Sequence, residues 1–271
     1  MSSDLLSLNQ RGILPAPSES EAEFLKRIEN SEEEEEINTL LSQEEWRDAH
    51  QSTRTLFGFS ADWVKAFYSR SRLPFWQGAV TWLGNPPLIQ LHPKFKSGSY
   101  FGFYKRSEVL AHEAVHAVRT PLLSNRFEEH FAYLTSERSW RRWLGPLFRT
   151  SFEGSLFLFT LLLAVCASYA AIWIPALERI AILPWLLLAA LLLRLRSDHR
   201  IFKKCEKNLR AILPKPEEAL FVMVRLTDEE IVTFSKLAPS EILHSIEKQK
   251  KLSLRWKILV VAYFKSDSCG R

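Results

Sequence analysis

The most pronounced apolar pattern lies in the second half of the chain, where no residue between Glu153 and Glu178 is charged. A membrane-spanning helix needs about 20 mostly apolar residues, so this run is long enough to cross a bilayer. The following run, residues 180–193, reaches the same length if its helix begins at Pro175, because proline is favoured in the first turn of a helix. The pattern predicts a hairpin of two transmembrane helices over residues 151–197.

Charged and aromatic residues near the ends of these runs predict how the hairpin lies in a membrane. Positive residues precede the first run and follow the second, whereas the connecting loop holds only Arg179. Cytoplasmic segments carry such an excess, so we expect both flanking regions to be cytoplasmic. The alternative is a hairpin buried in a soluble core, although 24 uncharged residues exceed ordinary core helices. The flanking residues are Arg138, Arg141, Arg142, Arg149, Arg194, Arg196, Arg200, Lys203 and Lys204, with Trp140, Trp143, Trp173 and Trp185 near the expected interfaces.

The segments before the hairpin change from polar to helical to strand-like. Residues 1–36 end in five consecutive glutamates, and a like-charge block of this kind is typical of a disordered, solvated tail. Residues 37–71 have a helical pattern, with helix starts at Ser42 and Ser60. Short apolar runs separated by glycine and proline turn signals then predict a small antiparallel sheet, with strands within 75–83, 88–92 and 100–104.

Helices are expected through the rest of the chain. Ser107 is a suitable N-cap for a helix that runs to about Arg119, and another helix is expected over 125–143. After the hairpin the pattern is helical again, and Thr227 opens a capping box. We therefore expect an α+β protein with four parts: a tail (1–36), an α+β domain (37–150), the hairpin (151–197) and a helical cytoplasmic region (198–271).

Composition and charge narrow the classes of partner. The net charge is only +5, and the basic residues cluster beside the apolar runs, which favours a lipid bilayer as partner and gives no support to nucleic acid. The three cysteines, Cys166, Cys205 and Cys269, are too few and too scattered for a disulfide framework. The N-terminus has no basic and apolar pattern of a cleaved signal peptide.

The candidate chemistry lies in the helix expected after the sheet. His112 and His116 are four residues apart, so a helix places both on one face, where two imidazole nitrogens can bind one zinc ion. Glu113 follows the first histidine and is suitably placed to take a proton from zinc-bound water. The other interpretation is an amphipathic helix that carries two ordinary histidines.

A catalytic zinc site needs a third protein ligand, and Glu128, Glu129 and His130 all compete for that position. At this point the chain resembles the gluzincins, the zinc peptidases with an HExxH helix and a glutamate on a second helix. In that clan a small residue follows the ligand glutamate at i+3, and an aspartate often follows at i+4. Ala132 supplies the small residue for Glu129, which makes Glu129 the preferred ligand and Glu128 the second choice. Tyr133 stands where the aspartate is expected.

The resemblance, which covers roughly residues 75–140, implies a membrane-anchored zinc metallopeptidase. Zn²⁺ would be held by His112, His116 and Glu129, with Glu113 as general base. Zincins bind a peptide substrate along a sheet edge, which points to 88–92 or 100–104. Candidates for stabilising the oxyanion are Tyr104, Tyr133, His130 and His92.

Two further expectations concern the chain as a whole. The hairpin is expected to be an anchor that follows a complete catalytic unit and takes no part in the active site. The competing hypothesis for the function is a non-catalytic membrane scaffold, or pseudopeptidase, whose metal site is structural or lost. In that case the acidic tail and the C-terminal helices would carry the function.

Overall fold

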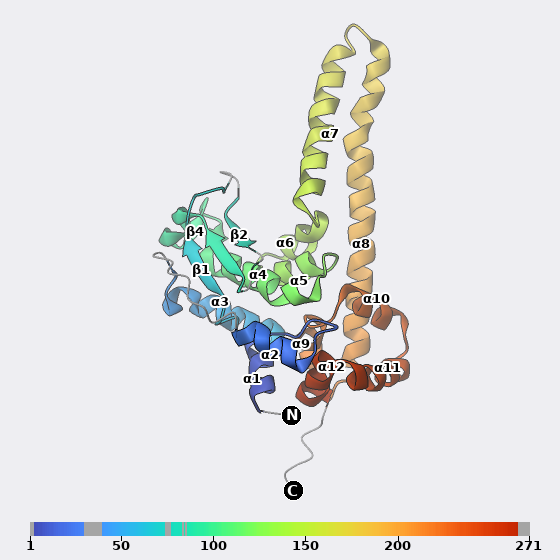
Figure 1. The fold of residues 1–271 in the computed structure, drawn as a ribbon. Coiled ribbons are helices and arrows are strands. Elements are labelled where there is room, and N and C mark those ends of the chain that lie inside the picture. The colour runs from blue at the N-terminus through green and yellow to red at the C-terminus, as the bar shows by residue number, and fades with distance from the viewer. Residues whose placement is uncertain (1–2, 30–39, 74–76, 83, 85, 265–271) are drawn as a thin grey trace.

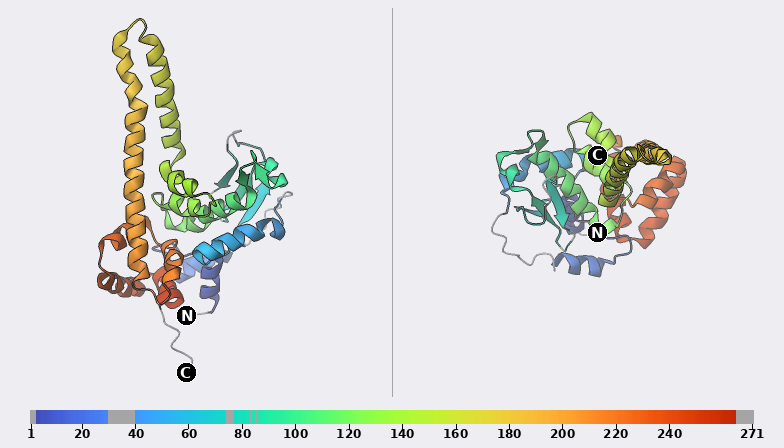
Figure 2. Two further views of the ribbon diagram at one scale, coloured as in Figure 1. Left: turned by 180° about the vertical axis from the view of Figure 1, so that it is seen from behind. Right: turned by 90° about the horizontal axis from the view of Figure 1, so that it is seen from above.

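In a computed structural model, two long helices rise as a hairpin from a body of shorter helices and a small sheet (Figure 1). The structure describes residues 3–29, 40–73, 77–82, 84 and 86–264. The described chain is α+β, as expected, with helices in the majority. Figure 2 shows the sheet and the first helices on one side of the hairpin axis, and the C-terminal helices around its base.

The prediction of a disordered tail is wrong for residues 3–29. They form helices α1 (Ser3–Arg11) and α2 (Glu21–Glu29), and the side chains of Leu5 and Phe24 are buried. Both pack with Leu254 and Ile258 near the far end of the chain, so the segment is ordered by a distant partner. The run Glu32–Glu36, on which the prediction rested, lies outside the described residues.

One of the two helices predicted in residues 37–71 forms. Ser42 caps α3 (Gln43–Phe57) in a capping box with Glu45, which confirms the first helix start. The helix expected from Ser60 is wrong, because β1 (Lys65–Tyr68) forms there. The Val64–Tyr68 stretch is β-branched and aromatic, a composition that suits a half-buried strand, and pairing with a neighbouring strand decides the outcome.

The sheet has three strands, and its topology differs from the antiparallel arrangement that was expected. Its order is β1–β3–β2, with β2 at Ala79–Trp82 and β3 at Leu88–Leu91. The β1–β3 pair is parallel, and the β2–β3 pair is antiparallel. The third expected strand, 100–104, is instead a small hairpin of β4 (Ser99–Tyr100) and β5 (Tyr104–Lys105), preceded by a 3-10 helix, η1 (Pro93–Ser97).

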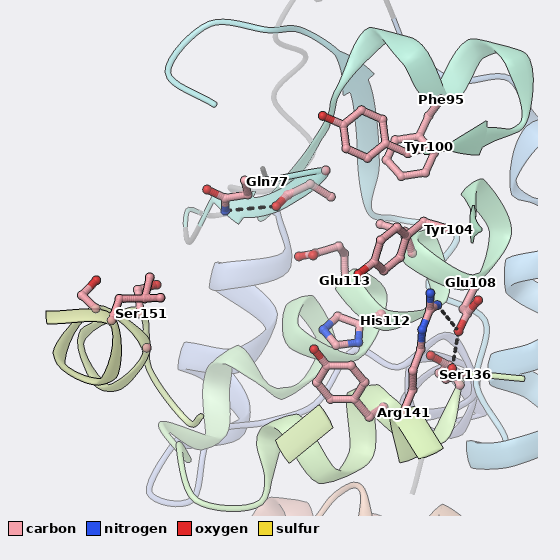
Figure 3. A pocket seen from close by; sticks show the side chains of 18 residues that line it. Gln77, Phe95, Tyr100, Tyr104, Glu108, His112, Glu113, Ser136, Arg141 and Ser151 are labelled. Carbon is pink, nitrogen blue, oxygen red and sulfur yellow. Dashed lines mark hydrogen bonds and ion pairs between the residues drawn. The ribbon is translucent and has the colours of Figure 1, made fainter. Parts of the chain in front are cut away.

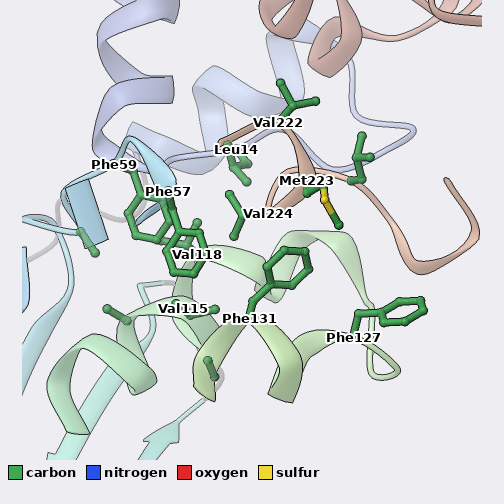
Figure 4. Packing of buried hydrophobic residues seen from close by; sticks show 14 of the residues in the cluster. Leu14, Phe57, Phe59, Val115, Val118, Phe127, Phe131, Val222, Met223 and Val224 are labelled. Atoms are coloured by element: carbon green, nitrogen blue, oxygen red, sulfur yellow. The ribbon is translucent and has the colours of Figure 1, made fainter. Parts of the chain in front are cut away.

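The expected metal helix forms close to its predicted bounds, as α4 (Arg106–Arg119). It packs against α3, the sheet and α5, and its apolar face belongs to the main core together with Phe57, Phe131 and Val224 (Figure 4). The prediction of a single helix over 125–143 is wrong. Two shorter helices replace it, α5 (Glu128–Leu134) and α6 (Ser139–Leu144), while 3-10 helices η2 (Thr120–Leu122) and η3 (Gly145–Leu147) flank the pair.

Two helices are long and apolar enough to cross a membrane. The first is α7 (Ser151–Ala170); the second runs over Pro175–Arg210, as the 3-10 helix η4 (Pro175–Ile182) followed by α8 (Leu183–Arg210). Only 6% of the apolar window in the first and 11% in the second is buried, so these helices are not the core of this chain. Cys166 and Cys205, which lie on them, are free.

The C-terminal region is helical, as predicted, and Thr227 caps its helix in a capping box with Glu230. It packs around the base of α8 and closes the floor of the main core, with Val222, Met223 and Val224 fully buried (Figure 4). Its elements are η5 (Pro216–Glu218), α9 (Ala219–Met223), α10 (Asp228–Lys236), α11 (Pro239–Leu252), α12 (Leu254–Leu259) and a π-helical turn (Val260–Phe264).

Buried arginines fasten this region to the rest of the body. Arg119, at the end of α4, donates hydrogen bonds to the carbonyl oxygens of Val224 and Leu226, at 2.7 and 3.2 Å. Arg255 pairs with Glu230 at 2.8 Å, and the Trp256 indole also donates to Glu230. Each guanidinium is nearly inaccessible, so these contacts replace lost hydration.

Glu230→Gln is expected to lower the free energy of unfolding by about 3 kcal/mol, because it leaves the buried Arg255 without its counter-charge. The measurement is urea denaturation of the full chain in detergent. Glu229→Gln is the matched control, since the neighbouring carboxylate is exposed on the same helix turn, and it should change the free energy by about 0.5 kcal/mol or less. Equal losses in the two variants would contradict the role given to the pair.

Candidate metal centre

The two histidines of the metal motif point to a common position. One turn of α4 separates them, and the Nε2 atoms of His112 and His116 are 3.2 Å apart. Two ligands at about 2.0–2.1 Å from a tetrahedral zinc ion stand about 3.4 Å apart, so this spacing suits a shared ion. Packing holds the helix in place, because Ala111, Ala114 and Val115, on the turns between and beside the histidines, are buried.

The second helix brings a carboxylate to the same position. On α5, Glu129 places its carboxylate oxygens 3.7 Å from the Nε2 atoms of both His112 and His116. One ligand atom from each of the three residues lies within 4.8 Å of the others, so the group is able to hold a metal ion. Two imidazoles and one carboxylate are a donor set that zinc accepts, with a fourth position left for water.

Glu128 takes a different position from its neighbour Glu129. Its Oε1 atom is 2.7 Å from Nδ1 of His116, on the side of the ring that faces away from the shared position. Burial alone lowers the pKa of His116, but this hydrogen bond and the charges of Glu113 and Glu129 raise it to about 9. Of the two candidate glutamates, Glu129 therefore lies in the group that could hold a metal ion, and Glu128 hydrogen-bonds to the other nitrogen of the His116 ring, where it would orient a metal ligand.

The first histidine is held by the backbone of α5. His112 has a hydrogen bond with the backbone of Ala132, while burial and the nearby His116 charge keep the pKa of His112 well below its usual value. A backbone contact thus supports this imidazole, a task that an aspartate at position 133 performs in the gluzincin pattern. Tyr133 places its ring edge-on to His112, with centroids 4.7 Å apart. Gly145 leaves room for this ring, because a Cβ there would lie 2.3 Å from it.

Glu113 points into a cavity beside the histidines (Figure 3). Thr81 of β2 donates a hydrogen bond from its hydroxyl to Oε2 of Glu113, at 2.6 Å. This contact fixes the carboxylate at the mouth of the metal group, where its charge also raises the pKa of His116. Thr81 was not singled out in the sequence, because only the antiparallel pairing of β2 with β3 brings it over α4.

The space in front of the metal group, here called the metal-site cavity, has a volume of about 490 Å³. Helices α4 and α5, the start of β2 and the β4–β5 hairpin line one side, and α7 lines the other (Figure 3). The expectation that the hairpin takes no part in the site is therefore wrong. Its residues in the wall are Ser151, Gly154, Ser155 and Leu158.

The cavity separates the four candidates for oxyanion stabilisation into two pairs. Tyr104 and Tyr133 line it, and burial raises the pKa of Tyr133, so its hydroxyl stays protonated. His130 lies elsewhere, packed against Phe127 and Phe202, with burial lowering its pKa to about 3. His92 caps η1 by accepting a hydrogen bond from the backbone of Lys94. Neither histidine is among the residues that line the cavity.

The prediction that residues 88–92 or 100–104 offer a sheet edge to an extended peptide is wrong. β3 (88–91) has β1 on one side and β2 on the other, so its backbone is already paired, and residues 101–103 form a turn. β2 is an edge strand of this sheet, since β3 is its one partner among the described strands. Gln77, Gly78 and Ala79, at and before its start, line the metal-site cavity.

The chain matches no known protein-family profile, and neither a curated protein nor a solved structure shows significant similarity to it. The arguments about this site therefore rest on its residues and their geometry.

Glu129→Gln and Glu128→Gln form a matched pair that tests the two glutamate positions. Glu129→Gln should weaken zinc binding more, because it removes a charged ligand. Glu128→Gln should weaken binding by about 10- to 100-fold, the usual effect of removing a hydrogen-bond partner of a ligand. Competition with a coloured chelator measures both affinities. A larger loss in Glu128→Gln would reverse the assignment of the ligand.

Zinc affinity should rise with pH between about 7 and 9. In the metal-free chain His116, whose pKa is about 9, holds a proton through most of this range. Glu129, whose pKa is about 7, holds a proton below it. A bound metal must displace these protons, at a cost of about tenfold in affinity per pH unit for each proton. Glu128→Gln should flatten the upper part of the curve, because it removes the hydrogen bond that raises the pKa of His116. A pH series of chelator competitions checks this, and a flat wild-type curve would contradict it.

Proposed function

We propose that this protein is a membrane-anchored zinc metallopeptidase of gluzincin type. The observation that carries the proposal is the convergence of His112, His116 and Glu129 beside a cavity that His112 lines together with Glu113. A structural zinc site is normally closed by four protein ligands, whereas three ligands beside a cavity suit a catalytic site.

The geometry supports a division of tasks among the residues. Zinc, when bound, would polarise a water molecule and the peptide carbonyl. Glu113 accepts the proton of the attacking water and passes it to the leaving amine, and Thr81 holds the carboxylate in place for both transfers. The hydroxyls of Tyr104 and Tyr133, which line the cavity, are suitable donors to the developing oxyanion. The backbone at the start of β2 offers an edge for an extended peptide.

We also propose that α7 and the Pro175–Arg210 helix cross a bilayer. Length, hydropathy and low burial support this, as do exposed aromatic residues at both ends of the hairpin. The positive residues at its base support a cytoplasmic position for the body of the protein and for both terminal regions. The exposed tryptophans are Trp140, Trp143, Trp173 and Trp185.

Glu113→Gln is the direct test of the enzymatic proposal. The variant should keep its zinc and lose peptide cleavage by about 10²- to 10⁴-fold, because glutamine cannot accept the proton. Zinc content is measured by metal analysis, and cleavage by mass spectrometry of a peptide library. Glu137→Gln is the control, since this exposed glutamate only pairs with Lys105 on the surface and both properties should persist. Wild-type protein without zinc, or cleavage that survives in Glu113→Gln, would overturn the proposal.

A further inference from the structure

One wall of the metal-site cavity belongs to the helix proposed to enter the membrane. Ser151, the adjacent Gly154 and Ser155, and Leu158 follow one another at steps of three or four residues along the first two turns of α7, so they share one face of the helix. Figure 3 shows Ser151 across the cavity from His112 and Glu113. A ligand that fills the cavity therefore contacts His112 and Glu113 on one side and α7 on the other.

Charged contacts mark the level at which this wall begins. Thr150 caps α7, and Glu153, in its first turn, forms an ion pair with Arg194 of α8. Asp198, one turn farther along α8, pairs with Arg126 and with Arg149. From residue 154 onward α7 carries no charge. The cavity wall thus extends from the last charged turn into the first uncharged turns, where a cytoplasmic membrane boundary would lie.

Exposed aromatic side chains lie at the same end of the molecule. Trp140 and Trp143 are more than half exposed, and their helix, α6, lies at the base of α7 (Figure 1). Phe101 and Phe103, in the turn between β4 and β5, are also exposed, and the flanking Tyr100 and Tyr104 line the cavity. Aromatic residues are enriched at membrane–water interfaces, so this surface suits contact with lipid headgroups next to the cavity.

Neither the backbone nor the packing of the described residues explains the glycine in the wall. Gly154 is helical, and a Cβ at this position would meet no atom within 4 Å. Glycine in a helix costs about 1 kcal/mol relative to alanine. Gly154 and the small side chains of Ser151 and Ser155 occupy little space, which leaves the cavity wide on the α7 side.

We infer that the substrate is the cytoplasmic juxtamembrane segment of another membrane-anchored polypeptide. Its backbone extends along the start of β2, and its side chains on the opposite side lie against the α7 wall. A chain that leaves the bilayer beside α7 reaches this space directly, and anchoring raises its effective concentration there. The inference rests on the proposed peptidase function and adds the substrate class and a specificity-determining surface.

The test uses the full chain in lipid nanodiscs. The probe is a polyleucine span followed by a mixed-sequence segment of about 40 residues, long enough to reach far beyond the cavity at about 3.3 Å per extended residue. Cuts, mapped by mass spectrometry, should cluster within about ten residues of the span, a reach of about 33 Å. Cuts spread evenly along the segment would overturn the inference while leaving the peptidase function intact.

Two serine variants on one helix test the wall itself. Ser155→Phe fills the cavity from the α7 side and should slow cleavage near the span by about tenfold or more, whereas Ser168→Phe, at an exposed site more than three turns farther along α7, should not. Zinc content and the thermal unfolding midpoint are measured for both, to show intact folds. Equal rates in the two variants would overturn the inference.

A binding measurement separates failure of this inference from failure of the proposed function. In the Glu113→Gln background, the probe should bind more weakly when Ser155→Phe is added and unchanged when Ser168→Phe is added. Binding with this pattern but without cleavage by the wild type would refute the peptidase and keep the α7 docking surface. Binding insensitive to Ser155→Phe would refute the docking surface.

Discussion

The candidate site depends on the way α4 is held. The four-residue spacing brings the two imidazoles together, and packing fixes their helix relative to α5, so that Glu129 reaches the same position. The buried alanines and valines of α4 pack against α3, the sheet and α5. Helix α5 contributes to this packing and to the chemistry at once. It buries Phe131 against the core, and its polar side presents Glu129 to the metal group, Glu128 to His116 and the Ala132 backbone to His112. A metal ligand set held on packed helices needs little rearrangement to bind its ion.

Local signals were enough to predict the start of α3 and of α10, the two long apolar helices and the approach of the two histidines. Ser42 and Thr227 each form the capping box that their sequence indicates, and the four-residue spacing places His112 and His116 together. The apolar runs predicted two helices of spanning length near their observed bounds. In each case the interacting residues lie within a few positions of one another, so their arrangement can be predicted from the local sequence pattern.

Features that depend on distant partners were not predictable in the same way. The parallel pairing of β1 with β3 links segments about twenty residues apart, and it converted an expected helix into a strand. Phe24 is buried in a cluster to which Leu254 and Ile258 contribute from the other end of the chain. Thr81 and the α7 residues lie at the site because of the tertiary fold, and the hydrophobic periodicity of the sequence does not predict such contacts. The choice between Glu128 and Glu129 rested on resemblance, and the geometry gives each glutamate a separate position.

The contacts between the chain ends have a consequence for the order of events during synthesis. Arg225, fully buried, donates hydrogen bonds to Asn9 and to the carbonyl oxygen of Phe57, and Asn9 in turn bonds to Tyr263. All the residues of the metal group precede the hairpin, but the layer that seals their core follows it. Both apolar helices must therefore be synthesised before the C-terminal helices can pack under α4 and complete the hydrophobic core. The core beneath His112 and His116 is complete only after both apolar helices, and the helices that follow them, have been synthesised.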